Sequence, residues 1–186
     1  MSDHFKRYLK FLPLLAFIFF AKSVFSGGWY AITIQNTQNV NTPAPFQQEI
    51  AICNGYPNVG SNFAYVVDPA LFNEINSNGQ NVYFTDANGN MLYSWYEGQG
   101  NYGATCDVWW LNISSGIPAN SNITIYMYVG TSNQNFYQMY YPYVGVSPQV
   151  DPSRRYDNGN YTFIAYGYFN STFDRWTGYK VPFSDP

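Results

Sequence analysis

Histidine is almost absent from this chain, and its only copy, His4, lies in a segment that we expect to be removed. Residues 1–26 combine basic residues near the N-terminus with an apolar run, 11–21, and end at Ser26, which is the pattern of a cleaved secretory signal peptide. The run is shorter than the ~20 apolar residues of a membrane span. A mature chain without imidazole excludes the Ser-His-Asp triad, the Cys-His pair and the His-ligated zinc site.

Positive charge is also scarce. After Ser26, four Lys and Arg residues stand against ten Asp and Glu, a formal charge of -6 on 160 residues. Phosphate binding needs clustered cations, and the only basic pair, Arg154-Arg155, is typical of a solvated loop, so we predict no nucleic-acid partner. Polarity comes mainly from amides, hydroxyls and 19 Tyr. Because these groups neither titrate in acid nor are screened by salt, we predict an exported protein that tolerates harsh surroundings.

Cysteine is limited to Cys53 and Cys106. In an oxidising compartment an even number of cysteines usually pairs, and we predict a disulfide worth roughly 4 kcal/mol on the chain-entropy model. Two buried thiols are the alternative. No cation lies nearby in sequence to activate either thiol.

Alternating apolar and polar residues indicate strands throughout the chain. In residues 123–129, Ile123, Ile125 and Met127 fall on one face and Thr124 and Tyr126 on the other. Residues 105–113 are apolar on both faces, as in a central strand. The other strands are predicted at residues 30–35, 48–53, 63–67, 82–86, 91–96 and 162–169. An Asn88-Gly89 pair between two of them indicates a β-hairpin.

Helical signals are few: residues 69–76, with proline in the first turn, and a weaker one at 134–140. We therefore predict an all-β fold, an antiparallel, jelly-roll-like β-sandwich with one or two short helices. The signal peptide would occupy residues 1–26 and the sandwich 27–150. Residues 151–186 would hold a C-terminal strand and tail, and possible beginnings of a second, lectin-like sandwich.

A series of short motifs follows this strand order. They are IQN ending at Asn36, FTD ending at Asp86, WYE ending at Glu97, VWW ending at Trp110, and IPA followed by IYMYVG ending at Gly130. Together they resemble the domain-of-unknown-function family 2341 of archaeal and bacterial surface proteins, over roughly residues 29–130. Residues 169–176 look like the lectin-like opening that often follows this domain. The resemblance implies a secreted or cell-surface module, often beside carbohydrate-binding domains, and supplies no catalytic residues.

Catalytic and metal sites have weak support. Glycoside hydrolysis needs two carboxylates, and Glu97 beside Trp95 and Tyr96 is the best candidate, but no second carboxylate stands at a diagnostic spacing. Residues 86–90 place oxygen ligands at alternate positions but lack the glycine and glutamate of a calcium loop, which favours the hairpin. We predict no enzymatic activity, no metal and no cofactor.

Aromatic residues are the best candidates for ligand binding, because flat rings with polar edges can stack on sugars. We predict that Trp95, Tyr96, Tyr126 and Tyr128 contribute, although core packing is the alternative for each tryptophan. Tyrosines at 137, 140, 141 and 143 form a second cluster that could cover a sheet edge. Asn122 and Asn160 are the turn-adjacent glycosylation sequons, candidates for modification of an exported chain.

These observations predict a secreted or cell-surface, non-enzymatic module that binds glycans or envelope proteins, with no stable membrane span after signal cleavage. The alternative is a filament or surface-lattice subunit that self-associates through an open sheet edge, since unpaired edges accept strands from other chains. A carboxylate-based glycosidase is the third hypothesis.

Overall fold

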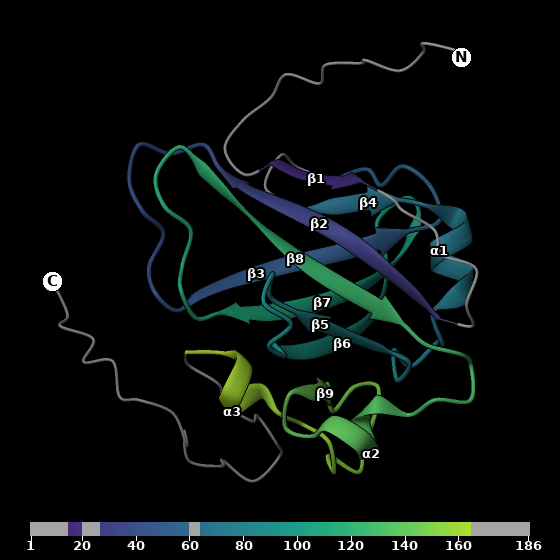
Figure 1. Ribbon diagram of the computed structural model, residues 1–186. Coiled ribbons are helices and arrows are strands. Elements are labelled where there is room, and N and C mark those ends of the chain that lie inside the picture. Colours follow the sequence, from purple (N-terminus) through teal and green to yellow (C-terminus); the bar gives the residue numbers. More distant parts are fainter. Residues whose placement is uncertain (1–14, 20–26, 60–63, 165–186) are drawn as a thin grey trace, which may run out of the picture.

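A computed structural model describes residues 15–19, 27–59 and 64–164 of the chain (Figure 1). Two sheets lie face to face and enclose the core, with short helices at the periphery. The predicted all-β sandwich with short helices is confirmed.

Sheet A has the strand order β1-β2-β8-β5, and all of its pairs are antiparallel. Its strands are β1 (Leu15–Phe19), β2 (Gly28–Asn36), β8 (Ser121–Val129) and β5 (Val82–Thr85). β2 and β8 pair over their full length, from Gly28 opposite Val129 to Asn36 opposite Ser121. This register places the buried residues of both strands on one face, toward sheet B.

Sheet B has the order β4-β3-β7-β6-β9. Its strands are β4 (Tyr65–Val67), β3 (Phe46–Cys53), β7 (Thr105–Ile113), β6 (Tyr93–Asn101) and β9 (Val144–Val146). The longer strands pair antiparallel as predicted, but the β3–β4 and β6–β9 pairs are parallel, so sheet B is mixed. Both exceptions are three-residue edge strands that return to the sheet after long connections.

The helices are α1 (Pro69–Glu74), α2 (Phe136–Tyr140) and α3 (Gly159–Thr162). The α1 signal in the sequence is confirmed, and the Asp68 side chain caps this helix by accepting from the amides of Ala70 and Leu71. The weaker signal corresponds to α2. Thr162 ends α3 instead of opening the strand predicted at 162–169; residues 165–169 of that prediction lie outside the described residues.

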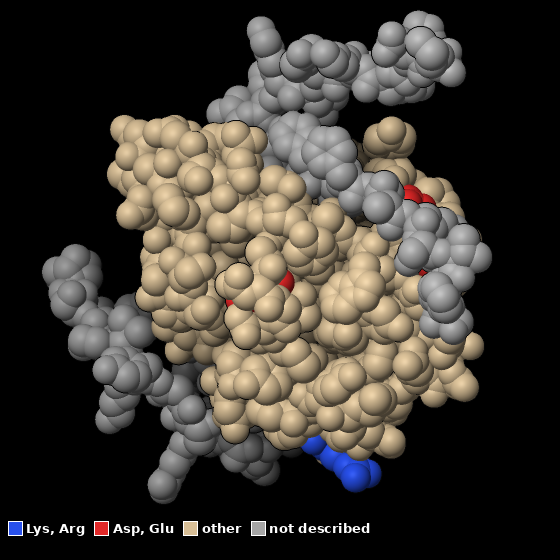
Figure 2. Space-filling view, in the orientation of Figure 1, with Lys and Arg blue, Asp and Glu red and all other residues tan. Residues whose placement is uncertain are grey.

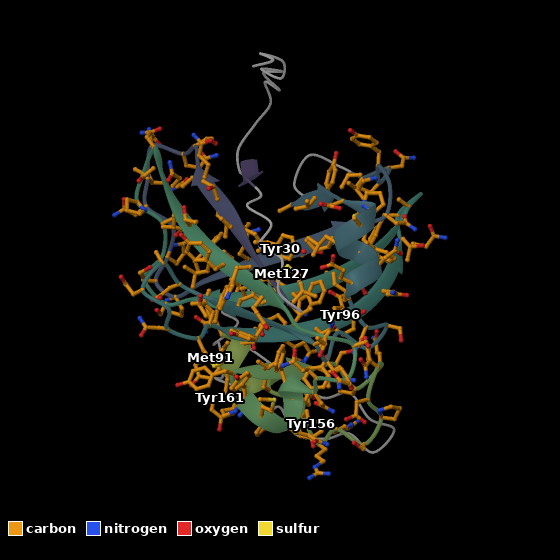
Figure 3. The ribbon with its side chains drawn as sticks, turned by 45° about the vertical axis from the view of Figure 1, so that its right-hand side comes forward. Tyr30, Met91, Tyr96, Met127, Tyr156 and Tyr161 are labelled. Carbon is orange, nitrogen blue, oxygen red and sulfur yellow. A yellow bond between two sulfur atoms is a disulfide. The ribbon has the colours of Figure 1, made fainter. Side chains whose placement is uncertain are left out.

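The core lies between the sheets, where Tyr30, Met127 and Tyr96 point inward (Figure 3). Tyr30 of β2 and Met127 of β8 are cross-strand partners, and both side chains are buried in the core. From sheet B, Trp109 packs against Tyr96 and Phe84 at centroid distances of 4.9 and 5.9 Å. The two sheets are therefore joined by large aromatic and aliphatic side chains, as their alternating sequences predict.

The Asn88-Gly89 turn exists, but it does not close a hairpin within one sheet. The amide of Asp86 donates to the Asn90 carbonyl at 2.8 Å and the amide of Leu92 to the Phe84 carbonyl at 2.9 Å, and a single antiparallel bridge joins Thr85 to Met91 between these bonds. β5 then continues in sheet A and β6 in sheet B. The chain therefore crosses between the sheets here, and Phe84 of β5 and Tyr96 of β6 enter the same core from opposite sheets. The hairpin prediction is therefore confirmed for the turn and for the short antiparallel contact beside it, and it was wrong only in expecting the two full strands to pair.

The predicted disulfide is confirmed. Cys53 and Cys106 are opposite each other on β3 and β7, with sulfurs 2.04 Å apart, and both are fully buried. The bridge closes a sequence separation of 53 residues, between two strands at the centre of sheet B.

Buried asparagines tie the loops to the strands. The Asn81 side chain donates to the carbonyls of Glu74 and Gly130 at 2.8 and 2.9 Å. The Asn158 side chain does the same for Ser94 and Pro142 at 3.0 and 2.7 Å. Asn36 donates to Ile117 and Pro118, both at 3.1 Å. Neutral amides thus satisfy buried carbonyls in this low-charge chain.

Candidate functional site

A row of aromatic side chains crosses the outer face of sheet A. Inward positions of β2, β5 and β8 are apolar, so their alternate residues face outward. Strand pairing then places Trp29 of β2 opposite Tyr128 of β8, and Tyr128 opposite Tyr83 of β5. Tyr140 of α2 extends the row beyond β5. We call these four residues the aromatic row.

The rings of the aromatic row are in direct contact. Centroids are 5.0 Å apart for Trp29 and Tyr128, 5.1 Å for Tyr83 and Tyr128, and 5.3 Å for Tyr83 and Tyr140. Phe136, 1% exposed, packs edge-on beneath Tyr83 at 5.0 Å. Burial, followed by the neighbouring Tyr140 and Tyr128, raises the pKa of the Tyr83 hydroxyl. The contacts hold the rings in fixed orientations, so the row is preorganised.

Trp29 is the most exposed member that the structure identifies, with 44% of its surface accessible. Its indole N–H makes no hydrogen bond to another described residue. The described strands β2, β5 and β8 contain no charged residue. Outside its grey atoms, Figure 2 shows this side of the molecule almost free of Lys, Arg, Asp and Glu. An exposed, uncharged row of this kind offers flat apolar surface with hydroxyls at its edges.

A groove of about 320 Å³ opens at the other end of the same region. It lies where β5 ends, since Thr85 pairs with Tyr126 and residues 121–125 of β8 have no β5 partner. Its polar lining comes from Asp86, Asn88, Ser114, Ser115 and Thr124. Tyr128, Tyr126 and Thr124 alternate along one face of β8, so row and groove are separated by about 14 Å along that strand.

The predicted ligand residues divide between the two sheets. Tyr128 belongs to the aromatic row, and Tyr126 lies half-buried between row and groove. Tyr96 is 0% exposed and lies in the core, so we do not include it in the site. Trp95 lies on the outer face of sheet B, where its indole N–H donates to Asp157 at 3.0 Å and Phe163 covers its ring.

Trp29, Tyr83 and Tyr140 were not among the predicted ligand residues, although Tyr140 was predicted in the tyrosine cluster at a sheet edge. Trp29 immediately precedes the strand predicted at 30–35 and has the parity of its outward residues, so the alternation carried a signal for its exposure. The proximity of Tyr83 and Tyr140 depends on strand order and on the position of α2, and neither is visible in a single sequence.

The outer face of sheet B also carries aromatic residues, and the indole N–H groups of its two tryptophans, Trp95 and Trp110, are hydrogen-bonded. The Trp110 indole N–H donates to a Glu97 carboxylate oxygen at 2.7 Å, and Phe163 packs on both Trp110 and Trp95. Beside them, Tyr93 stacks on Tyr143 and Tyr161 at 4.8 and 5.5 Å. The segment that includes α3 therefore packs against this face, together with Tyr143 of the predicted tyrosine cluster.

The predicted catalytic carboxylate, Glu97, is thus engaged by Trp110. Glu49 lies opposite Trp110 on β3, and burial, followed by the nearby Glu97, raises the pKa of its carboxyl. Asp107 is fully buried on β7 and accepts from the Tyr96 hydroxyl at 2.5 Å. Burial raises the pKa of Asp107 to about 6, against the lowering effect of hydrogen bonds from Tyr96 and Gln99.

Asp86 has the opposite behaviour. Slight burial acts to raise the pKa of its carboxyl, but hydrogen bonds from Asn90, Asn88 and Gly89 lower it below its ordinary value. These bonds occupy the Asp86 oxygens within the turn. Among the described residues, no group of three or more His, Cys, Asp and Glu is placed to hold a metal ion.

Two further observations concern the predicted glycosylation sites and the helices. Asn122 and Asn160, the predicted glycosylation sites, are both exposed. None of the helices in the described parts of the chain has the length and apolar character needed to cross a membrane.

Comparison with known proteins agrees with the resemblance seen in the motifs. Residues 78–138, from the end of the loop before β5 to α2, match the model of a domain of unknown function, DUF2341. The chain is also similar to the uncharacterized protein 562 of Sulfolobus islandicus rod-shaped virus 1, with 37% identity over 142 residues. That alignment covers 74% of this chain and 21% of the viral protein, so the chain spans about a fifth of its relative. No solved structure matches the chain.

The matched segment contains part of the aromatic row. Tyr83 and Tyr128 lie within residues 78–138, whereas Trp29 and Tyr140 lie outside them. The lectin-like opening predicted at 169–176 lies outside the described residues.

Proposed function

We propose that this protein is a secreted or cell-surface, non-enzymatic module that binds neutral glycans on the outer face of sheet A. The aromatic row is the observation that carries the proposal. Four rings in contact across three strands and a helix form a fixed stacking surface, and Trp29 leaves 44% of its surface to solvent. Sugar rings present apolar C–H faces that pack on such rings.

The groove supplies the second element of recognition. Amide and hydroxyl groups of Asn88, Ser114 and Thr124 line it, and these groups can bond to sugar hydroxyls. A glycan chain that follows β8 would contact the row near Tyr128 and the groove near Thr124. The site therefore favours an extended polysaccharide over a monosaccharide.

Charge supports the choice of a neutral ligand. The described residues contain two cations, Arg154 and Arg155, and both lie in the loop before α3. The strands under the aromatic row carry no charge. Sulfated or uronic acid polymers would therefore find no cation at the row to pair with.

Isothermal titration calorimetry of the mature chain with neutral and sulfated polysaccharides tests the proposal. We expect saturable binding to a neutral polymer and an affinity loss of about tenfold or more for Trp29→Ala and for Tyr128→Ala. Tyr56→Ala is the matched control, because Tyr56 is 83% exposed on a loop outside the row. Equal affinity in all three variants, or preference for the sulfated polymer, would contradict the proposed site.

Glu97→Gln addresses the non-enzymatic part of the proposal. The amide keeps an oxygen that can accept from Trp110, so the local structure should persist. Binding should be unchanged, and neither protein should release reducing sugars from the bound polymer. Hydrolysis by the parent chain that disappears in Glu97→Gln would instead indicate a glycosidase.

A further inference from the structure

The edges of the two sheets differ in length. β4 and β9 border sheet B with three residues each, and β5 borders sheet A with four. Short edge strands give little backbone for another chain to pair with. At the other border of sheet A, the short strand β1 pairs with β2. Without β1, the border strand would be β2, which has nine residues.

β2 has none of the features that usually protect an edge. Its sequence, GWYAITIQN, contains no charged residue and no proline. It pairs with β8 over its whole length without a register shift, so it presents a long regular edge. Such an edge accepts a further strand unless something covers it.

In this structure β1 covers the β2 edge, with residues 15–19 antiparallel to residues 31–35. β1 has the sequence LAFIF and lies within the segment that we interpret as a secretory signal. The inference rests on that interpretation, since removal of residues 1–26 takes β1 away. Residues 31–35 of β2 would then lose their partner strand.

We propose that in the mature protein the β2 edge accepts residues 164–169 of a second copy of the chain, so that copies join head to tail. The pairing of β1 shows that an uncharged, proline-free segment fits this edge over five residues. Residues 162–172, TFIAYGYFNST, are likewise free of charge and proline and rich in aromatic residues, which favour strands.

The position of the donor segment favours a second copy over the same chain. Residues 164–169 follow directly on α3, which contacts β6 and β7 of sheet B. In Figure 1, α3 lies on the opposite side of the molecule from β1. The donor segment therefore begins on the side of the molecule away from the β2 edge of its own chain. Donor and acceptor are different surfaces, so the contact repeats into a filament or closes into a ring.

Assembly and glycan binding use separate groups. The acceptor pairs through the backbone of residues 31–35, whereas the aromatic row begins at Trp29 and lies on the outer face. A variant that no longer assembles can therefore still be tested for glycan binding, and a variant that no longer binds glycan can be tested for assembly.

The first experiment uses the full chain secreted with its own leader. Mass spectrometry should place the N-terminus at Gly27, and sedimentation velocity over a hundredfold concentration range should show growing polymers, visible by electron microscopy. Tyr166→Asp with Tyr168→Asp should sediment as a monomer, while the control Tyr56→Asp should polymerise as the parent does. A mature protein that retains residues 15–19, a monomeric parent, or unchanged polymers in the double variant would each overturn the proposal.

A second measurement leaves the protein unaltered. A synthetic peptide of residues 162–170 should compete for the edge, reducing polymer mass at least tenfold when present in excess. Hydrogen exchange should then show protection of the amides of residues 31–35 that a scrambled peptide does not give. Polymers that persist, with exchange at residues 31–35 unchanged, would overturn the proposal whatever the variants show.

Discussion

The two sheets use aromatic residues in different ways on their outer faces. On sheet A, Trp29, Tyr83 and Tyr128 contact one another, and Trp29 is open to solvent. On sheet B, Trp95 and Trp110 donate to Asp157 and Glu97, and Phe163 packs over both rings. An indole that is hydrogen-bonded and covered contributes to stability, whereas an indole that is neither is available to a ligand.

Charge follows the same division. The strands β2, β5 and β8 contain no charged residue, while β3, β6 and β7 contain Glu49, Glu97 and Asp107. Titration below neutral pH therefore acts on sheet B and leaves the strands of the aromatic row unaffected. The comparison separates a face that holds the fold together from a face that can bind.

Removing Trp110 should give the largest loss of stability. Trp110→Ala deletes a half-buried ring and leaves Glu97 without its hydrogen-bond donor. We expect the free energy of unfolding to fall by about 3 kcal/mol and Tm to fall by roughly 10 °C, measured by calorimetry. Polysaccharide affinity should be unchanged at a temperature where the variant is folded. A tenfold loss of affinity would show that sheet B also binds.

Asp107 should make the protein more stable in acid. Its folded-state pKa of about 6 exceeds the ordinary value of 3.8, so the folded protein binds the proton more tightly. This contribution is fully present below the unfolded pKa and is lost as pH rises through 6. We expect unfolding to require about 2 kcal/mol more at pH 4 than at pH 7, from denaturant titrations at each pH.

Asp107→Asn is the control for this pH dependence. The amide keeps the size of the side chain and can accept from the Tyr96 hydroxyl, but it does not titrate. The gain in the free energy of unfolding between pH 7 and pH 4 should become smaller in the variant. A smaller gain should remain, because the pKa of Glu49 is also raised. A parent chain that loses stability as the pH falls would contradict the assignment.

Trp29→Ala should have the smallest effect on stability. The substitution removes two ring contacts, to Tyr83 and Tyr128, from a side chain that is already 44% exposed. We expect a cost of about 1 kcal/mol or less, measured by the same denaturant titration. A cost that equals the cost of Trp110→Ala would remove the difference between the two faces.

Much of the fold follows from local pattern. Residues 105–113 coincide with β7, and the alternation at 123–129 lies within β8, because each strand buries one regular set of side chains. β9 was missed because three residues with a central glycine carry no period, and its pairing with β6 is parallel and distant in sequence. The crossing at Asn88-Gly89 also depends on which sheet each strand joins, and that is decided by tertiary packing.

Less of the candidate site than of the fold could be predicted from the sequence. Tyr128 could be placed on an outer face from alternation, and Trp29 shares that parity. Their contact required the β2–β8 register, and Tyr140 required the position of α2. Tyr96 was wrongly predicted as a ligand residue because neighbouring residues of β6 alternate between the core and the outer face of sheet B. The sequence did not determine whether Trp95 or Tyr96 would point into the core, because that depends on how β6 pairs with its neighbours.

The most direct test of the account is a titration of the mature chain with a neutral polysaccharide at pH 4 and pH 7, followed by tryptophan fluorescence, in the parent and in Trp29→Ala. We expect a saturable change in the parent, affinities that agree within about threefold between pH 4 and pH 7 because no strand of sheet A carries a group that titrates in this range, and no change in the variant over the same polysaccharide concentrations. A response that persists without Trp29, or that appears at one pH only, would contradict the claim that the uncharged face of sheet A is the binding surface.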